Sequence, residues 1–494
     1  MLTGKKYGRV AILFYRMGPY HFARLQAAGK LLDITLIEIF REDKIYGWSQ
    51  VRGTDGFDRR TLFENESQTT RDLRARIQTA LDSCWPSVVV IPGWSDAIAF
   101  SAIQWCRNHQ VPAIVMSEST EWDRSRGWLR EWIKRRILKL YVGGLVGGKP
   151  HAEYLARLGV PGENIFQGYD AVDNRYFAEK AAEVRTQKAG RTLCSPSPRL
   201  WEEAGSGGHP PSQSCAATGK VEIDERPTPT LSPDREGKAE IGKIYCAIRQ
   251  LPASPFFLAS ARFVEKKNLF RLLQAFARYR TLCEAGSPKS EVKSQSSQNG
   301  KQETEIEALN PGLRSSISAP WSLVLLGDGP LKPGLMRLIS ELGLQNCIHL
   351  PGFKQYDELP AYYGSAQVFI HASTTEQWGL VVNEAMASGL PVLVSNRCGC
   401  ARDLVKEGVN GFTFDPLDVG QLAQLMLKIS AANFPLSDFG SQSQRSILQW
   451  GPERFANGLK AAVGDALNAG PPSMNFFDSI LLNALLKCKI QYGA

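Results

Sequence analysis

Short apolar runs alternate with helix-like segments along this chain, and this alternation most constrains its fold. It runs from Val10 to Leu158, stops, and restarts from Phe256 to Ser430. Apolar strands separated by helices are typical of parallel sheets that helices cover on both faces. The sequence therefore predicts an α/β fold with two doubly wound sheets. The expected strands are 10–15, 34–40, 87–91, 113–116, 141–146, 256–260, 323–326, 348–350, 368–371, 392–394 and 412–414.

The breaks in the alternation predict the domain organisation. We expect an N-terminal domain over 1–172, a second domain over 173–449, and C-terminal helices over 450–494, the first of which returns to the N-terminal domain. Residues 182–242 and 284–313 are rich in Ser, Pro, Gly or charged residues and poor in periodic apolar residues. Such segments cannot build a core, so we expect two disordered surface insertions within the second domain.

Composition narrows the class of protein. The net charge of +9 fits a nucleic acid, an anionic membrane or a phosphorylated substrate as partner, but no nucleic-acid-binding module is visible. Among ten cysteines, the one close pair, Cys398 and Cys400, has no matching pair and no His nearby, which favours reduced thiols over a zinc site. No segment reaches the roughly 20 apolar residues of a membrane span, and no signal peptide is apparent. We therefore expect a cytoplasmic protein.

The stretch from His371 to Ser395 holds the strongest functional pattern. Two carboxylates, Glu376 and Glu384, flank the point near Gly379 or Leu380 where a helix is expected to begin. The free N–H groups and the dipole of a helix N-terminus attract anions. Carboxylates repel phosphate, so this pair is expected to bind uncharged hydroxyls on either side of it. An anion flanked by polyols describes a nucleotide sugar.

Two cations provide a partner for that anion. Arg262 and Lys267 follow the strand expected at 256–260, where Arg offers a fork of donors and Lys a point charge to one diphosphate. The alternative is a solvated basic turn. No D-x-D pair occurs, so no metal–diphosphate site of that kind is predicted.

Two glycine-rich turns have weaker interpretations. Gly327–Pro330 ends a buried strand and permits either close approach to a ligand or a purely structural turn. Residues 143–150 match the spacing of a phosphate loop, but Pro150 replaces the hydroxyl residue that binds magnesium, which excludes a nucleotide triphosphatase loop.

Residues 124–139 interleave Arg and Lys with Trp128, Trp132 and other apolar residues. One apolar face and one cationic face suit a helix at an anionic membrane surface. The alternative is a sheet-covering helix with a solvated charged face. Single histidines such as His349 and His371 are most simply structural, whereas His21 lies in a strand-to-helix loop that should face the cleft.

These motifs together resemble the retaining family 4 glycosyltransferases, whose fold is GT-B. The resemblance is carried by Arg262 with Lys267, by Gly327–Pro330, by Glu376 with Glu384, and by the Glu-Gly-Val-Asn-Gly-Phe segment at 407–412. It implies two Rossmann-like domains that face a central cleft. It also implies transfer of a hexosyl-type sugar from a nucleotide-diphosphate sugar to a glycan, lipid-linked or other acceptor, without a metal or other cofactor. Such an enzyme of polysaccharide or glycoconjugate biosynthesis would be cytoplasmic, with peripheral attachment to the inner face of a membrane through 124–139.

The resemblance also implies roles for individual residues. Arg262 and Lys267 would hold the donor diphosphate and stabilise the leaving group, and Glu376 would contact the donor sugar. Glu384 would bind the ribose. The remaining donor-binding residues would be Gly18 in a loop that closes over the donor, and the amides of Gly379, Leu380 and Val381.

The acceptor side departs from the family pattern. After the strand that ends at Met116, the family often has a His, whereas this chain has Ser117-Glu118, so Glu118 joins His21 as an acceptor-side candidate. Two other functions fit the same motifs: a GT-B sugar-nucleotide epimerase, and a non-catalytic sugar-nucleotide-binding protein at a membrane. A phosphorylase would need a lysine-bound cofactor site, which the sequence does not reveal.

Overall fold

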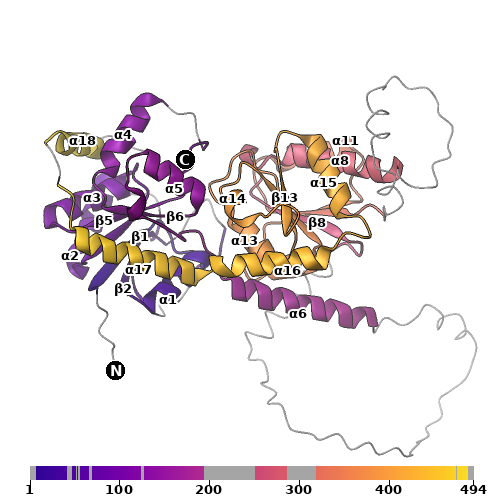
Figure 1. The fold of residues 1–494 in the computed structure, drawn as a ribbon, viewed down its shortest axis with the longest axis horizontal. Helices are drawn as coiled ribbons and strands as arrows, with labels where there is room; N and C mark the ends of the chain where they lie inside the picture. The colour runs from indigo at the N-terminus through magenta and orange to yellow at the C-terminus, as the bar shows by residue number, and fades with distance from the viewer. Residues whose placement is uncertain are drawn as a thin grey trace, which may run out of the picture.

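The computed structural model describes residues 7–41, 47–51, 53, 56–65, 69–123, 127–193, 251–285, 319–473 and 476–487. Within these residues the chain forms two α/β domains that lie side by side (Figure 1). Each domain is built on one parallel sheet with helices on both faces. The predicted α/β class with two doubly wound sheets is confirmed.

The N-terminal domain contains a seven-stranded sheet in the order β3-β2-β1-β4-β5-β6-β7. Its strands are β1 (Arg9–Phe14), β2 (Asp33–Phe40), β3 (Asp58–Phe63), β4 (Val88–Pro92), β5 (Ala113–Ser117), β6 (Gly143–Val146) and β7 (Ile165–Gln167). Its helices are α1 (Pro19–Gly29), α2 (Thr70–Cys84), α3 (Ala97–His109), α4 (Trp128–Leu138) and α5 (Lys149–Arg157), with a short 3-10 turn at Gly162–Asn164.

The second domain contains a six-stranded sheet in the order β10-β9-β8-β11-β12-β13. Its strands are β8 (Phe256–Ser260), β9 (Ser322–Leu326), β10 (Ile348–Gly352), β11 (Val368–His371), β12 (Val392–Ser395) and β13 (Gly411–Phe414). Its helices are α6 (Asn174–Leu193), α8 (Leu269–Ala285), α11 (Lys332–Glu341), α12 (Leu359–Ser365), α13 (Leu380–Ala387), α14 (Ala401–Leu404), α15 (Val419–Ile429) and α16 (Leu436–Ile447), with a 3-10 turn at Glu265–Lys267.

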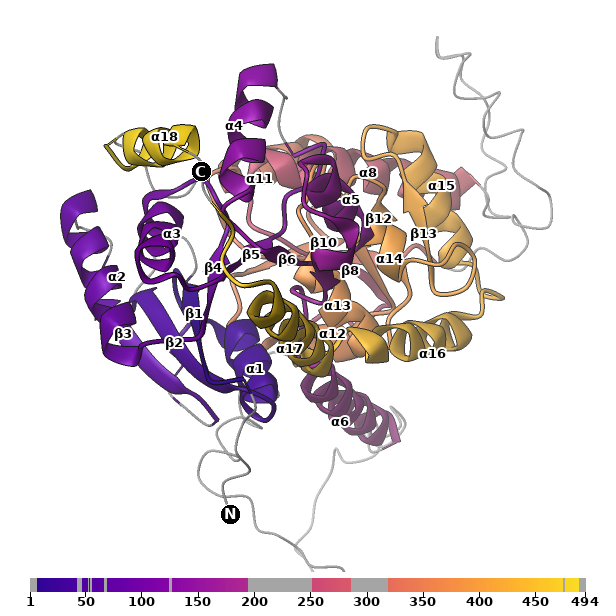
Figure 2. The ribbon, with the colours of Figure 1, turned by 60° about the vertical axis from the view of Figure 1, so that its left-hand side comes forward.

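The C-terminal helices return to the N-terminal domain. After a 3-10 turn at Leu448–Trp450, α17 (Pro452–Ala469) packs against α1 and beside β6 and β7. In Figure 1, α16 and α17 follow one another along one side of both domains. The last helix, α18 (Phe476–Lys487), packs on α3 and α4, as Figure 2 shows.

Burial explains why the strands are continuously apolar. Val10 and Ile12 of β1 belong to the core on one face of the first sheet, whereas Ala11 and Leu13 belong to the core on the other. Successive side chains of a strand point to opposite faces, so a sheet that helices cover on both sides has no polar face.

Several elements of the fold, the short helix α14 among them, were not predicted. β3 is an edge strand whose charged residues Asp58, Arg59 and Arg60 give no apolar run. The strand β7 and the helix α16 were also missed. The expectation of disorder from residue 182 is wrong up to residue 193, because α6 continues to Leu193 through helix-forming Ala, Glu and Lys residues and packs on α12 and α13. In the same way, α8 includes 284–285. The remainder of both expected insertions, 194–242 and 286–313, lies outside the described residues.

Candidate functional site

The carboxyl ends of two neighbouring strands bring the predicted charged residues together. β8 pairs with β11 in parallel, so the segments that follow these strands meet at one edge of the second sheet. Lys267 lies on the 3-10 turn after β8, and Glu376 lies on the loop after β11. Ligands bind at such edges in open α/β sheets.

Glu376 is the centre of a buried polar network. One of its carboxylate oxygens, Oε2, accepts a hydrogen bond from Lys267 Nζ and another from Ser373 Oγ at 3.3 Å. The same oxygen lies 3.5 Å from His371 Nε2, which is itself 3.2 Å from Ser373 Oγ. Lys267 and Glu376, which the sequence analysis assigns to the diphosphate and the sugar of one donor, are therefore in direct contact, and their roles in a reaction stay predictions.

The side chains of this network keep one another charged. Burial alone would raise the pKa of Glu376, but the Lys267 ammonium and His371 hold it well below its usual range. Burial opposes a charge on His371, yet the neighbouring Cys398 and Glu376 raise the pKa of His371 to about 9. With His371 and Lys267 positive and Glu376 negative, the network carries one net positive charge.

Arg262 lies in a loop that the glycine turn shapes. The backbone N–H of Phe263 donates to the carbonyl of Asp328 at 2.8 Å, so the two loops lie in contact. Gly327 has φ +123°, and a Cβ there would lie 1.8 Å from the carbonyl oxygen of Ala261. The structural interpretation of Gly327–Pro330 thus has direct support, because no other residue fits beneath the loop that carries Arg262.

The helix α13 begins where the sequence predicted, at Leu380. Gly379 precedes it with φ +100°, and a Cβ on Gly379 would lie 3.1 Å from Cys398 Sγ and 3.5 Å from His371 Nε2. The first N–H groups of a helix have no acceptor within the helix. The helix therefore starts next to the cationic network, and its first amides are those of Gly379, Leu380 and Val381. This position favours the binding of an anion.

Glu384 accepts hydrogen bonds from both domains. It is fully buried, and it accepts hydrogen bonds from Tyr20 of α1 in the N-terminal domain and from Tyr363 Oη of α12 at 2.6 Å. Burial raises the pKa of Glu384 to about 7, although both tyrosine hydrogen bonds oppose that rise. The carboxylate predicted to bind a ribose thus has two tyrosine hydroxyl groups as partners.

The acceptor-side candidates lie in the N-terminal domain. Gly18 precedes α1 in an extended conformation, and its N–H donates to His21 Nδ1 at 3.2 Å. Burial and the neighbouring Arg24 lower the pKa of His21 to about 3, so its imidazole is neutral. Burial raises the pKa of Glu118, and the charge of Glu376 in the other domain raises it further. Glu118 therefore lies close enough to Glu376 to interact with it.

The phosphate-loop-like segment contacts the second domain. His151 Nε2 lies 2.8 Å from the carbonyl oxygen of Gln377, next to Glu376. The N–H of Lys149 donates to Asp403 Oδ2 at 2.9 Å, and a Cβ on Gly148 would lie 2.3 Å from that oxygen. The glycines thus allow α5 to approach the loop that carries Glu376.

Sequence reasoning missed several residues of the site. His371 was expected to be structural, although its place at the end of β11 could have indicated the site. Tyr20, Tyr363 and His151 carry no motif and reach the site only through the packing of helices. Among the residues that the structure describes, no cluster of His, Cys, Asp and Glu is large enough to hold a metal ion.

A known family model matches part of the second domain. Residues 302–445 match the family model described as glycosyl transferases group 1. The alpha-monoglucosyldiacylglycerol synthase of Acholeplasma laidlawii is 30% identical over 153 residues, which are 31% of this chain and 37% of the relative. The sulfoquinovosyl transferase SQD2 of Arabidopsis thaliana is 42% identical over 100 residues, 20% of this chain and 19% of the relative. The chain thus matches less than two fifths of the length of these relatives.

Solved structures resemble the whole fold. A glycosyltransferase from Rickettsia africae covers 94% of this chain, and 99% of its own chain is matched, with a TM-score of 0.59 at 11% identity. The sucrose-phosphate synthase of Thermosynechococcus elongatus covers 92%, with 97% of its own chain matched, a TM-score of 0.59 and 14% identity. At such identities the likeness shows the fold alone, which is GT-B, as the sequence resemblance implied.

Proposed function

Because residues 302–445 match the family model of the group 1 glycosyl transferases, we propose that this chain is a retaining, metal-independent glycosyltransferase. It takes a hexosyl-type sugar from a nucleotide-diphosphate sugar and transfers it to a hydroxyl of a glycan, lipid-linked or other acceptor. The observation that carries the proposal is the Lys267–Glu376 pair beside the first turn of α13. A nucleotide sugar places a diphosphate next to a sugar, so its site needs a cation for the diphosphate next to a carboxylate that accepts hydrogen bonds from the sugar hydroxyls.

The charges of the site fit a diphosphate. Lys267 and His371 are cationic and Glu376 is anionic, so their network carries one net positive charge, and the α13 N-terminus adds a partial one. Arg262 follows the same strand, β8, as Lys267 and is the further cation that we assign to the diphosphate. Glu376, held ionised, accepts hydrogen bonds from sugar hydroxyls. The donor therefore lies with its diphosphate over Gly379 and its sugar at Glu376.

The reaction breaks the bond between the anomeric carbon and the diphosphate oxygen. The acceptor hydroxyl forms the new bond on the same face of the sugar, and its proton passes to an oxygen of the departing diphosphate. Charge grows on that diphosphate in the transition state, so fixed cations beside it lower the barrier. Closure of the cleft excludes water from the sugar cation.

The names of similar proteins support the donor and acceptor classes. Anabaena HepE, with a TM-score of 0.57 and 13% identity, was solved in complex with UDP-glucose. The Acholeplasma relative is named as a synthase of a glucosyl lipid. For this chain we propose a nucleotide-sugar donor and an acceptor in glycan or glycolipid synthesis.

We also propose a peripheral position at the inner face of an anionic membrane. Helix α4 leaves Trp128, Leu129 and Trp132 exposed beside Arg130 and Arg135. Aromatic and cationic side chains together favour the membrane interface. In the described parts of the chain, no helix has the length and apolar character needed to cross a membrane.

A donor screen followed by a turnover assay tests the proposal. Thermal unfolding with UDP-, GDP- and ADP-sugars identifies the donor as the one that raises the melting temperature. The release of nucleoside diphosphate from that donor, in EDTA, then distinguishes a transferase from a non-catalytic binder. An enzyme that converts the donor into an epimeric sugar nucleotide without releasing nucleotide would contradict transfer.

A further inference from the structure

Three neighbouring strands of the first sheet bring two carboxyl groups together next to the second domain. The strands β5, β6 and β7 pair in parallel. Glu118 follows β5 and Asp170 follows β7, while Gly147 directly follows the middle strand, β6. A Cβ on Gly147 would lie 2.4 Å from Asp170 Oδ2 and 3.1 Å from Cε3 of Trp378 in the second domain. Because Gly147 has no side chain, the carboxyl group of Asp170 has room to reach toward Glu118.

The carboxyl group of Asp170 is buried without a hydrogen-bond donor. Asp170 is 1% exposed, and among the described residues no group donates a hydrogen bond to either of its carboxyl oxygens. A buried polar group in this state needs a physical explanation. Burial and the neighbouring Glu118 raise the pKa of Asp170 well above its usual range. Asp170 therefore keeps its proton and donates it to the carboxylate of Glu118, with which it is hydrogen-bonded.

Arg24, the cation beside this pair, is used by the N-terminal domain itself. Its Nη2 lies 3.9 Å from Asp170 Oδ1, its Nε–H donates to the carbonyl of Ala171 at 2.9 Å, and its guanidinium lies 5.2 Å from the centroid of the Tyr169 ring. Arg24 is 1% exposed, so it cannot turn toward a ligand. The charged groups that act most strongly on Glu118 are this one cation and three acids, namely Arg24, Asp170, Glu376 and Asp123. Glu118 therefore presents a negative charge, and none of these groups adds a free positive one.

Glu118 lies between the two domains. It is the more exposed member of the pair, and the charge of Glu376 acts on it from the second domain. The loop that carries Glu118 also contacts the second domain, because Trp122 Nε1–H donates to the carbonyl of Arg397 at 3.2 Å. Since we assign Glu376 to the donor sugar, Glu118 lies on the side from which the acceptor meets that sugar.

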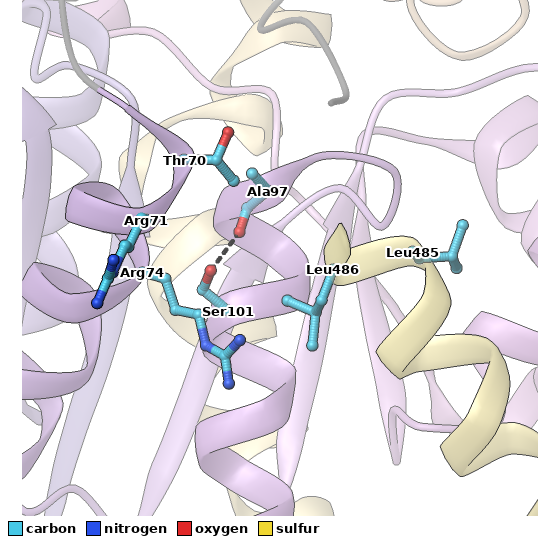
Figure 3. A pocket seen from close by; sticks show the side chains of 7 residues that line it. All are labelled: Thr70, Arg71, Arg74, Ala97, Ser101, Leu485 and Leu486. Carbon is cyan, nitrogen blue, oxygen red and sulfur yellow. Dashed lines mark hydrogen bonds between the residues drawn. The ribbon is translucent and has the colours of Figure 1, made fainter. Parts of the chain in front are cut away.

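A hollow with a cationic border lies elsewhere in the N-terminal domain. It has a volume of about 240 Å3, lies between α2, α3 and α18, and is bordered by Arg71 and Arg74 (Figure 3). Figures 1 and 2 place these three helices on the side of the domain that is turned away from the second domain. The Asp96 carboxylate caps the start of α3 by accepting the N–H groups of Ile98 and Ala99. These arginines therefore do not alter the charge around Glu118.

We propose that Glu118, fixed by its hydrogen bond with Asp170, binds a hydroxyl next to the reacting one on an uncharged polyol acceptor and disfavours acceptors that carry a phosphate or a carboxylate there. A carboxylate accepts hydrogen bonds from hydroxyl groups and repels anions. The inference rests on the proposed transfer reaction and narrows its acceptor to a neutral sugar or a neutral glycerol-type hydroxyl. Asp170 does not touch the acceptor; it is a positioning residue that acts through Glu118.

Pairs of acceptors that differ by one phosphate test the inference on the full chain with its donor. Glycerol is compared with glycerol 3-phosphate, and glucose with glucose 6-phosphate, by the release of nucleoside diphosphate. In each pair that reacts, kcat/KM should be at least about tenfold higher for the neutral member, because two like charges a few Å apart in a partly buried site repel one another strongly. A phosphorylated member that reacts as well as its neutral partner would overturn the inference.

Variants of the carboxyl pair test the residues. Glu118→Gln keeps the shape of the side chain without its charge, so the preference for neutral acceptors should fall at least about fivefold while donor binding is unchanged. The matched control, Glu121→Gln, removes the same charge from an exposed position of the same loop and should keep the preference. Asp170→Asn still donates to Glu118 and should also keep it, whereas Asp170→Ala should raise the acceptor KM more than it lowers kcat. An unchanged preference in Glu118→Gln, or a lost one in Asp170→Asn, would contradict these roles.

Binding of the phosphate esters decides the case in which no pair reacts. In calorimetric titrations of the protein saturated with nucleoside diphosphate, neither glycerol 3-phosphate nor glucose 6-phosphate should bind with a Kd below about 1 mM. Tighter binding would show a free cation on the acceptor side and overturn the inference. A chain that transfers sugar to a phosphorylated acceptor keeps the proposed function and loses this inference. A chain that binds the donor but releases no nucleotide, and does not bind the esters, loses only the proposed function.

Discussion

The two domains, whose sides at the candidate site we call its two walls, differ in the kind of group that they bring to it. The second domain presents charged side chains that hold one another ionised, namely Lys267, Glu376 and His371. The N-terminal domain presents a neutral imidazole at His21 and a tyrosine hydroxyl at Tyr20. This difference supports the proposal that the bond-breaking chemistry belongs to the second domain and that the first domain binds the acceptor.

The largest effect should come from a cation of the second domain. Arg262→Ala removes a group that faces the departing diphosphate, so kcat/KM for transfer should fall by roughly 10²- to 10³-fold. The exposed Arg337→Ala on α11 is the matched control and should retain activity. Steady-state nucleotide release measures the activity of both variants. Near-normal activity of Arg262→Ala would contradict the assignment of the chemistry to the second domain.

A smaller effect, on the free energy of unfolding, is expected at Glu384, the buried carboxylate that both domains contact. The pKa of Glu384 rises from its ordinary value of 4.5 to about 7. The folded protein therefore holds a proton that the unfolded chain releases above pH 4.5, so the free energy of unfolding falls as pH rises from about 4.5 to 7 and is level above that. The slope cannot exceed about 1.4 kcal/mol per pH unit for one proton.

Denaturant titrations at several pH values check this slope. Glu384→Gln should lack it, and should also bind the donor about tenfold more weakly because an amide is a poorer acceptor for ribose hydroxyls. An equal pH slope in Glu384→Gln and the unsubstituted protein would assign the proton to another group.

Tyr20 should affect donor affinity by only a few fold, and in the favourable direction. If the ribose and Tyr20 compete for Glu384, Tyr20→Phe removes the competitor, and the donor should bind about fivefold more tightly, as one net hydrogen bond is worth about 1 kcal/mol. Tyr363→Phe is the control. Tyr363 also donates to Glu384, but from α12 of the same domain, so we do not expect it to compete with the ribose. Calorimetric titration with the donor would contradict this competition if both variants bound it equally well.

The smallest effect is expected at His21. His21→Ala removes the side chain that accepts the Gly18 N–H, so the free energy of unfolding should fall by about 1 kcal/mol. Because the pKa of His21 is about 3, the pH–rate profile of the variant should keep its shape between pH 5 and 8. If the rate of the variant no longer depended on pH in a part of this range where the rate of the unsubstituted enzyme does, His21 would have a proton-transfer role. Both domains would then contribute to the chemistry.

The donor side was predictable because its signals are local. Glu376, the start of α13 and the left-handed Gly389 after its end all lie in one stretch, where Gly389 has φ +76°. Arg262 and Lys267 could be placed at the same edge because parallel strands end together. Local patterns of glycine, charge and apolar period therefore recover the elements of the second domain that carry the candidate site.

The contacts between the walls were not predictable. Tyr20 and Glu384 are 364 positions apart, and His151 and Gln377 are 226 apart. No periodicity relates such residues, since their contact depends on how two finished domains pack. The helical part of 182–193 was missed because its Ala, Glu and Lys residues also suit a solvated segment.

The rate of sugar transfer by Lys267→Ala at saturating donor tests the central claim most directly. The account predicts that this variant still binds the donor, as a donor-dependent rise in melting temperature, while kcat falls at least about 100-fold because the ammonium stabilises the departing diphosphate. The neighbouring Lys266→Ala should turn over normally. A Lys267→Ala protein with kcat within a few fold of the unsubstituted enzyme would contradict the assignment of the chemistry to the second domain.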